Sequence, residues 1–270
     1  MQKLLLTATV ALCCAAYCAD NTGDDAAANK LLEAYSSMQY PQAKKLAAGS
    51  KRPEFQLIYA LCEVYDRRAQ NLKHGMPELE RLSKDPSLPE KFRPTAKLAY
   101  ARAMHTLGLR KNVYTPAEGF DPEPLYNEII STYPDKIEAV YAVIYRAQYN
   151  MDKGNIENEI LRLEKFLNDY KGPVSYTGSI HFLLAQEYIR TGKRYAQAVK
   201  HYEKFRDAGI ANPRNQVTVM FQIARIYDFY LKDKVSAERE YLRFLKEHPN
   251  SSEAIVAKRY LKELKAEMGK

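Results

Sequence analysis

The C-terminal half of the chain carries one spacing of small and aromatic residues twice, and this repetition limits the folds it can adopt. The first copy reads Ala185, Tyr188, Ala198, Tyr202 and Phe205, and the second copy, 39 residues later, reads Ala224, Tyr227, Ala237, Tyr241 and Phe244. Small residues let neighbouring helices approach closely, while aromatic rings fill the gaps between them. The repetition therefore predicts stacked helical hairpins, none of which could bury its apolar face alone.

The remaining sequence alternates helical apolar patterns with short turn segments. We expect helices over 26–46 (a short pair), 55–71, 77–82, 92–107, 125–133, 137–151, 157–170 and 254–268. Pro77 is suited to the start of a helix, and Ser251 offers an N-cap for the last one. The Gly- and Pro-rich segment 108–124 is the longest break in the pattern. No stretch alternates apolar and polar residues between hairpin turns, so we expect no β-structure.

Composition and charge place the chain among ordinary folded proteins with a basic C-terminal part. Of 270 residues, 46% are hydrophobic and 27% are charged, so disorder is not expected. The net charge is +8, and the excess lies in the last hundred residues, with 19 Lys or Arg against 11 Asp or Glu. This part could face anionic lipid, an acidic protein segment or an anionic polysaccharide, or it could simply be a solvated surface. Nucleic acid is disfavoured because no binding motif is present.

The N-terminal segment has the pattern of a secretory signal. Lys3 precedes an apolar run over 4–16, and small and polar residues follow it. We expect a signal peptide over 1–19 and a flexible linker over 20–28, with a buried N-terminal helix as the alternative. The expected location is the periplasm or the outer membrane.

Four cysteines bear on anchoring and redox chemistry. A bacterial lipidation motif needs a small residue before the cysteine, whereas Leu12 precedes Cys13 and Tyr17 precedes Cys18. Ordinary cleavage is therefore favoured, and lipidation at Cys18 stays open as a route to membrane association. Cys62 occupies a small-residue position on a helical stripe, so we interpret it as a buried apolar residue, with a reactive thiol as the alternative.

The two copies resemble the tetratricopeptide repeat family. The endings of 241–249 and 125–134 match its second-helix ending, with a proline five residues after Phe244 and after Ile129. The family's tryptophan is missing, and Phe182 and Phe221 stand near its position. Tyr188 and Ala198 lie ten positions apart, one more than usual, which predicts longer turns at 191–193 and 232–234. The resemblance implies an all-α solenoid of helical hairpins in a right-handed superhelix, with degenerate repeats over 29–134, regular repeats over 135–250 and a capping helix over 251–270.

The segment 244–254, Phe-Leu-Lys-Glu-His-Pro-Asn-Ser-Ser-Glu-Ala, is similar to an exported bacterial subgroup of that family. This subgroup includes the coordinator of the Tol–Pal system and the repeat lipoprotein of the outer-membrane barrel-assembly machinery. Its members bind partner proteins in a tyrosine-rich concave groove. The resemblance therefore implies an interaction scaffold of the cell envelope, whose partner is a protein or peptide.

The residues expected to line such a groove lie on first-helix faces. They are Tyr141, Tyr145, Tyr149, Phe182, Gln186, Arg190, Phe221, Arg225 and Asp228. The aromatic rings could stack on a bound peptide while the two arginines pair with its carboxylates. For tyrosines at repeat packing positions, such as Tyr188 and Tyr241, core packing is the better interpretation.

No pattern of a catalytic or metal site is found in the sequence. The five histidines lack zinc-ligand spacing, and we expect them on the surface or in turns. Neither a Gly-x-Ser-x-Gly motif nor a phosphate-binding glycine loop is present. The carboxylate pairs Asp228 with Asp233 and Glu157 with Glu159 are interpreted as solvated charges. We expect no enzyme activity, cofactor or metal, and keep two alternatives to the scaffold: docking on anionic polymer or lipid through the basic C-terminal half, and an uncharacterised hydrolase.

The repeat assignment predicts the effect of enlarging one small residue. Replacing Ala224 with Leu should overfill the helix crossing and lower the free energy of unfolding by about 1–3 kcal/mol. Chemical denaturation followed by circular dichroism measures this change. An unchanged unfolding midpoint would argue against a packed repeat at this position.

Overall fold

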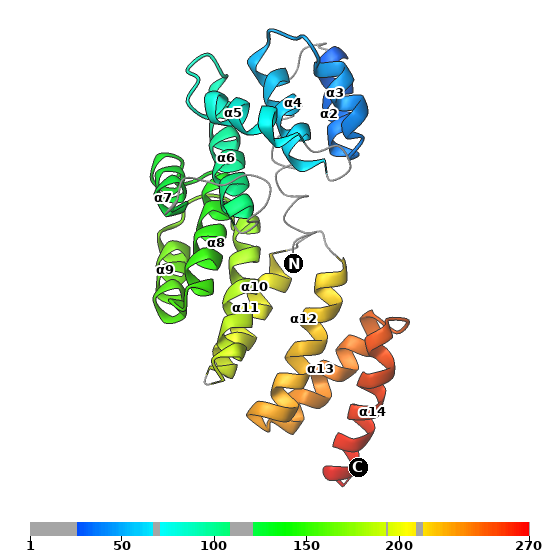
Figure 1. Cartoon of the computed structure of the whole chain (residues 1–270). Helices are drawn as coiled ribbons and strands as arrows, with labels where there is room; N and C mark the ends of the chain where they lie inside the picture. Colours follow the sequence, from blue (N-terminus) through cyan, green and yellow to red (C-terminus); the bar gives the residue numbers. More distant parts are fainter. Residues whose placement is uncertain (1–25, 67–70, 109–120, 193, 209–212, 270) are drawn as a thin grey trace. The chain divides into compact units, whose positions relative to one another are not determined.

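The computed structural model describes residues 26–66, 71–108, 121–192, 194–208 and 213–269. Every regular element in these ranges is helical, and helices adjacent in the sequence pack in pairs (Figure 1). The chain divides into two compact units, Met1–Lys153 and Gly154–Lys270. The expected all-α architecture of helical hairpins is confirmed.

The N-terminal unit contains eight described elements. They are α2 (Ala26–Ser36), α3 (Tyr40–Ala47), α4 (Pro53–Tyr65), α5 (Leu72–Ser83), the 3-10 turn η1 (Glu90–Phe92), α6 (Arg93–Gly108), α7 (Glu123–Thr132) and α8 (Ile137–Asp152). Helices α2 and α3, α4 and α5, and α7 and α8 pair, and α6 contacts α5, α7 and α8. Each pair buries an apolar face that a single helix would expose to water.

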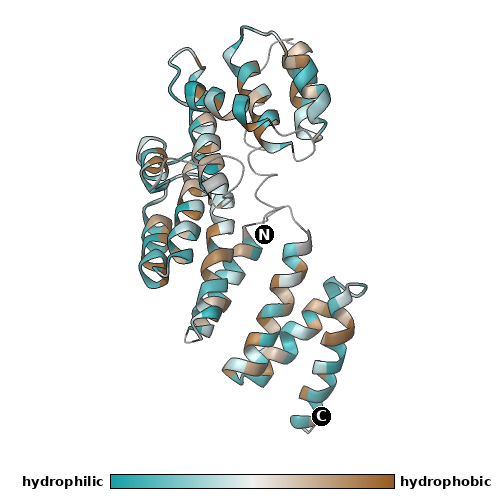
Figure 2. Ribbon diagram, in the orientation of Figure 1, coloured by the Kyte–Doolittle hydropathy of each residue, from teal (hydrophilic) through white to brown (hydrophobic). Residues whose placement is uncertain are grey.

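The C-terminal unit contains seven elements among its described residues. They are α9 (Ile156–Asp169), α10 (Val174–Arg190), α11 (Tyr195–Asp207), α12 (Pro213–Arg225), the π-helical turn η2 (Ile226–Leu231), α13 (Lys234–Glu247) and α14 (Ser252–Glu267). Helix α10 pairs with α11, and α12 pairs with α13, so the two copies of the sequence pattern form two hairpins. Figure 2 shows hydrophobic stretches alternating with hydrophilic ones along these helices, as amphipathic packing requires.

Some expected boundaries differ from the structure. The linker expected over 20–28 overlaps α2, which begins at Ala26, and the repeat boundary expected at 134/135 falls between α7 and α8. Because those two helices pack together, the first compact unit continues to Lys153. The expected signal segment and Cys18 lie outside the described residues, as does most of the break expected over 108–124.

Pro77 does not begin a helix, although the sequence suggests that it should. It is the sixth residue of α5, because the Asn71 carbonyl accepts the N–H groups of His74 and Gly75 and starts the helix earlier. A proline just after the first turn removes only one helical hydrogen bond. Ser251 is the N-cap of α14 but makes no side-chain cap; its hydroxyl donates instead to the His248 carbonyl.

Gly75 sets how closely α4 and α5 approach each other. A Cβ atom at this position would lie 2.8 Å from Cβ of Glu63, 2.9 Å from Cγ2 of Val64 and 3.2 Å from the Ala60 carbonyl oxygen. These atoms belong to the backbone or lie close to it, so they cannot easily move aside. Crossing at this glycine brings the two helices into direct backbone contact.

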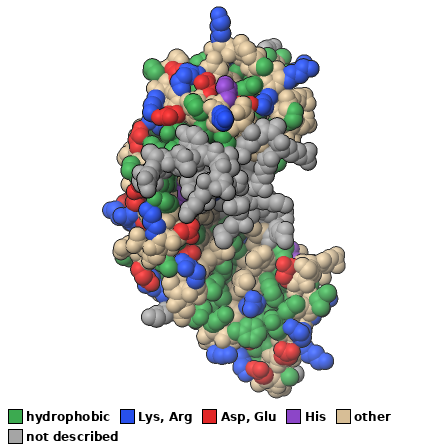
Figure 3. Space-filling view, in the orientation of Figure 1, with side chains coloured by type: hydrophobic (Ala, Val, Ile, Leu, Met, Phe, Trp, Pro, Cys, Tyr) green, Lys and Arg blue, Asp and Glu red, His purple; other side chains and the backbone are tan. Residues whose placement is uncertain are grey.

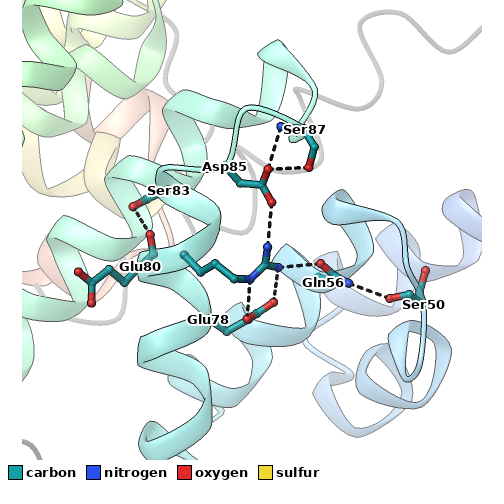
Figure 4. A network of polar contacts seen from close by, with 8 residues as sticks. Ser50, Gln56, Glu78, Glu80, Ser83, Asp85 and Ser87 are labelled. Atoms are coloured by element: carbon teal, nitrogen blue, oxygen red, sulfur yellow. Dashed lines mark hydrogen bonds and ion pairs between the residues drawn. The ribbon is translucent and has the colours of Figure 1, made fainter.

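Arg81 ties α5 to α4 and to the following loop on the surface of the N-terminal unit. Its guanidinium donates two hydrogen bonds to Glu78, of 2.6 and 3.0 Å, and others to Asp85 and Gln56, each of 2.8 Å. Figure 4 shows this network converging from the helix, the loop at Ser87 and the neighbouring α4. The hydrogen bonds from Arg81 hold the pKa of Glu78 below its usual value.

An aromatic trio packs each C-terminal hairpin. In the first hairpin the ring of Phe182 lies 5.1 Å from that of Phe205 and 6.0 Å from that of Tyr202, measured between centroids. The second hairpin repeats the trio 39 residues later, at 5.5 and 6.4 Å, with Phe221, Phe244 and Tyr241. Tilted ring pairs at these separations are the favoured geometry for aromatic side chains. The sequence repeat therefore reproduces a specific packing unit.

The two hairpins accommodate the same spacing in different ways. In the first, α10 ends at Arg190 and a longer turn, in which Gly192 has a φ of +72°, precedes α11 at Tyr195. In the second, the helix continues to Leu231 through the π-helical turn η2, and only Lys232 and Asp233 separate it from α13. Four residues, 191–194, thus separate α10 from α11, although Lys193 of the longer turn expected at 191–193 lies outside the described residues. The longer turn expected at 232–234 is replaced by a wider helical turn.

The close crossing at Gly75 predicts that replacing this glycine with alanine lowers the free energy of unfolding, whereas the same change in an open helix raises it. In an open helix, Gly75→Ala would stabilise the chain by up to about 1 kcal/mol. Here the added methyl group meets atoms closer than van der Waals contact, so we expect a net loss of about 1–3 kcal/mol. Urea denaturation measures the change, and a stabilised variant would contradict the close crossing.

Candidate functional site

Tyr141, Tyr145 and Tyr149 share one stripe of α8, but the structure gives them different environments. Tyr145 has no exposed surface, and its ring packs against Tyr126, with the Arg102 guanidinium 4.2 Å from the ring centroid. It therefore cannot line a groove, and that expectation is wrong. The reason is that α8 contacts both α6 and α7, so the middle of its aromatic stripe is buried.

The two outer tyrosines of this stripe are half-buried and also have neighbours. The ring of Tyr141 stacks on Tyr145 at 6.2 Å, and Tyr149 meets the edge of His105 at 5.2 Å. The Lys153 ammonium lies 3.9 Å from the Tyr149 ring centroid. These contacts fix the rings against their own unit and leave both residues half-buried.

Phe182, Gln186 and Arg190 follow one another along α10. Phe182 is half-buried in the aromatic trio of its hairpin, and Gln186 is half-buried as well. Arg190 is exposed at the end of the helix, and its Nε donates to Glu187 at 2.7 Å. The expectation that these residues form a binding surface stays a prediction, with Phe182 contributing mainly to packing.

The best-defined candidate site lies on α12, η2 and α14, and we call it the aromatic face: Phe221, Arg225, Asp228, Phe229 and Tyr260. The rings of Phe221 and Tyr260 are almost parallel, with centroids 6.4 Å apart, and Phe229 meets Tyr260 edge-on at 5.1 Å. The Phe229 side chain is 40% exposed. Hydrophobic side chains gather on the visible side of the C-terminal helices (Figure 3).

The turn η2 accounts for the exposure of its aromatic residues. A π-turn inserts an extra residue into the helix, which turns the side chains that follow it away from their regular positions. Phe229 and Tyr230 are 40% and 47% exposed, and Tyr230 stacks on Tyr195 of α11 at 4.2 Å. The turn closes at Lys232, whose φ of +57° is left-handed, and the Tyr227 carbonyl accepts the N–H groups of both Lys232 and Asp233.

Opposite charges flank the rings of the aromatic face. The Arg225 guanidinium lies 5.8 Å from the Phe221 ring centroid, and its buried Nε has no hydrogen-bond partner among the described residues. Asp228 accepts a hydrogen bond of 3.1 Å from the Tyr241 hydroxyl. Burial raises the pKa of Asp228, and the nearby carboxylates of α14 raise it further, although the Tyr241 hydrogen bond opposes this shift.

Sequence reasoning found Phe221, Arg225 and Asp228 but missed Phe229 and Tyr260. A signal for Tyr260 was available, since it lies 39 residues after Phe221, which itself lies 39 after Phe182. No comparable signal exists for Phe229, because its exposure depends on the π-turn. The other carboxylates weighed in the sequence have structural contacts: Asp233 caps α13 by accepting from the Ser236 N–H, and Glu157 pairs with Arg194. Glu159 is buried and pairs with Arg162, so its interpretation as a solvated charge is wrong.

A hollow of about 510 Å³ opens beside the first C-terminal hairpin. His181 of α10 and His201 of α11 line it, and their Nδ1 atoms are 2.9 Å apart. Burial, and then the neighbouring His201 and Lys204, lower the pKa of His181 to about 4. His105 and His181 are both buried, so the expectation that the histidines lie on the surface or in turns is wrong for these two.

Cys62 is buried within α4, as expected from its small-residue position. Burial raises the pKa of its thiol to about 12, which leaves little reactive thiolate at neutral pH. None of the described helices is both long and apolar enough to cross a membrane. No protein-family model matches the sequence, and no curated protein matches it either.

The burial of His105 predicts a loss of stability in mild acid. Burial, together with the Arg102 charge, lowers its pKa from 6.5 to about 4, and its Nδ1 lies 3.0 Å from the Tyr126 hydroxyl. As the pH falls, the His105 imidazole is protonated in the unfolded chain before it is protonated in the folded one. The free energy of unfolding should therefore decrease between pH 6.5 and pH 4, by about 2–3 kcal/mol for this group. The variant His105→Asn should lose that part of the pH dependence. Urea denaturation at several pH values tests this, and a difference between variant and wild type that does not change with pH would contradict it.

Proposed function

We propose that the protein is a non-catalytic interaction scaffold of the bacterial cell envelope, and that its aromatic face binds a segment of a partner protein. The observation that carries this proposal is the exposure of Phe229 beside the half-buried rings of Phe221 and Tyr260. Exposed aromatic residues clustered on a folded surface are typical of recognition sites. The signal-like N-terminus supports placement in the periplasm or at the outer membrane.

The structure of the aromatic face suits a protein partner better than a small molecule. Its rings come from three elements held by α13, so the surface is formed before a partner arrives. Arg225 lies beside Phe221, and Asp228 lies close to Glu263 and Glu267 on α14. An apolar side chain of the partner would sit between a basic and an acidic group, which orients a bound segment.

Docking of the basic C-terminal half on anionic polymer or lipid is the second candidate. Its support is the excess of 19 basic over 11 acidic residues in 171–270. Several of these basic side chains pair with carboxylates, as Arg194 does with Glu157 and Lys234 with Glu267. Such pairing reduces the charge that remains for a polymer, which is why we favour the aromatic face.

The proposal predicts that a polar residue at position 229 weakens partner capture without unfolding the chain. Phe229→Ser removes an exposed ring, so helix content and unfolding midpoint should change little, whereas capture from an envelope extract should fall about tenfold or more. Leu161→Ser on α9, which is 61% exposed, is the matched control and should capture normally. Mass spectrometry identifies what is captured.

Ionic strength separates the two candidates. Binding at the aromatic face should persist between low and high salt, whereas docking on anionic vesicles or polysaccharide should weaken steeply. A partner that both serine variants capture equally would place recognition elsewhere on the protein. Salt-sensitive binding to anionic vesicles, with no protein captured, would favour the second candidate.

A further inference from the structure

Two histidines meet across the first C-terminal hairpin in a geometry that its packing does not require. The Nδ1 atoms of His181 and His201 face each other at 2.9 Å, with ring centroids 5.1 Å apart and ring planes inclined by 43°. Two imidazole nitrogens this close share either a proton, as in an N–H···N hydrogen bond, or a positive ion, since two lone pairs would repel each other.

The second hairpin shows what packing alone accepts at these positions. Met220 and Glu240 stand 39 residues after His181 and His201, and both are buried in the same kind of helix pair. Glu240 is neutralised there by Arg239 and Arg206. The hairpin fold therefore forms without histidine at either position, and the histidine pair is a local feature of α10 and α11.

The distance between the two nitrogens fits shared coordination of one ion. Imidazole binds zinc at about 2.0–2.1 Å, and two such ligands at a right angle would lie about 3.0 Å apart. At a tetrahedral angle the separation would be about 3.4 Å. The observed 2.9 Å is close to the first value, and a small side-chain rotation reaches the second.

The hollow beside the pair leaves room for the other ligands of such an ion. Glu164 lies on its lining and is held by a hydrogen bond from the Tyr188 hydroxyl. In the part of the chain that the structure describes, no group of three or more His, Cys, Asp or Glu side chains is arranged to hold a metal. Two protein nitrogens and water in the hollow would form an open, exchangeable site. The Lys204 ammonium on the same lining would lower the affinity of the site for the ion, because the two positive charges repel each other.

We propose that His181 and His201 form a two-histidine site for a divalent transition-metal ion such as Ni²⁺ or Zn²⁺. Imidazole nitrogen is a preferred ligand of both ions. One ligand comes from each helix of the hairpin, so a bound ion cross-links α10 to α11. An ion that binds only the folded hairpin also raises its stability.

The test is calorimetric titration of the tag-free chain with Ni²⁺ and, separately, Zn²⁺ near neutral pH. We expect saturable binding of one ion per chain and a metal-dependent rise in the unfolding midpoint. His181→Met installs the residue that the second hairpin carries at this position, so it should fold while binding the ion at least about tenfold more weakly. His74→Gln alters an exposed histidine in the other unit and should bind as the wild type does.

A second variant keeps the result interpretable if His181→Met folds poorly. His201→Gln removes the other ligand from a half-buried position and should weaken binding by a similar factor. The proposal is overturned if neither ion binds, or if both ions bind the folded His181 and His201 variants as tightly as the wild type. Loss of binding in His74→Gln alone would also overturn it by placing the ion in the N-terminal unit.

Discussion

Aromatic packing inside each hairpin is the interaction on which the C-terminal unit depends. In the first hairpin the Phe182 ring packs against the rings of Tyr202 and Phe205. The residues 39 positions later make the same contacts in the next hairpin, and the corresponding centroid distances differ by only 0.4 Å (5.1 against 5.5 Å, and 6.0 against 6.4 Å). A second contact joins neighbouring hairpins: the Tyr188 hydroxyl donates to Glu164, and Glu203 lies near Tyr227 one period later. Short-range contacts of this kind let each hairpin stabilise its neighbour.

Much of the fold could be predicted because packing leaves a periodic trace in the sequence. The buried alanines 185, 198, 224 and 237 mark helix crossings, and all four have no exposed surface. Helix boundaries were harder to predict where a single hydrogen-bonding residue decides them. The Asn71 carbonyl, for example, sets the start of α5. The aromatic stripe of α8 was misleading because periodicity shows which residues share a face but not how many neighbours cover it.

The candidate site was less predictable than the fold. Phe221 and Asp228 follow from helical spacing, and the 39-residue period also predicts Tyr260. Phe229 could not be predicted in this way, because the same residue types form α-helices and π-turns, which differ only in their hydrogen-bond register. Buried polar groups such as His105 and the Thr95–Glu138 hydrogen bond leave no periodic signal either, because their partners Tyr126 and Glu138 are distant in the sequence.

Lys232, whose backbone is left-handed, shows that the same spacing between helices can be accommodated in two different ways. In the first hairpin the additional length lies in the turn between α10 and α11, where Gly192 is exposed. In the second it lies within the helix, and the chain recovers its direction only by placing a non-glycine residue at a φ of +57°. The same spacing therefore lengthens a turn in one hairpin and reshapes the helix surface in the next. A repeat protein can acquire new outward-facing rings in this way while its core remains unchanged.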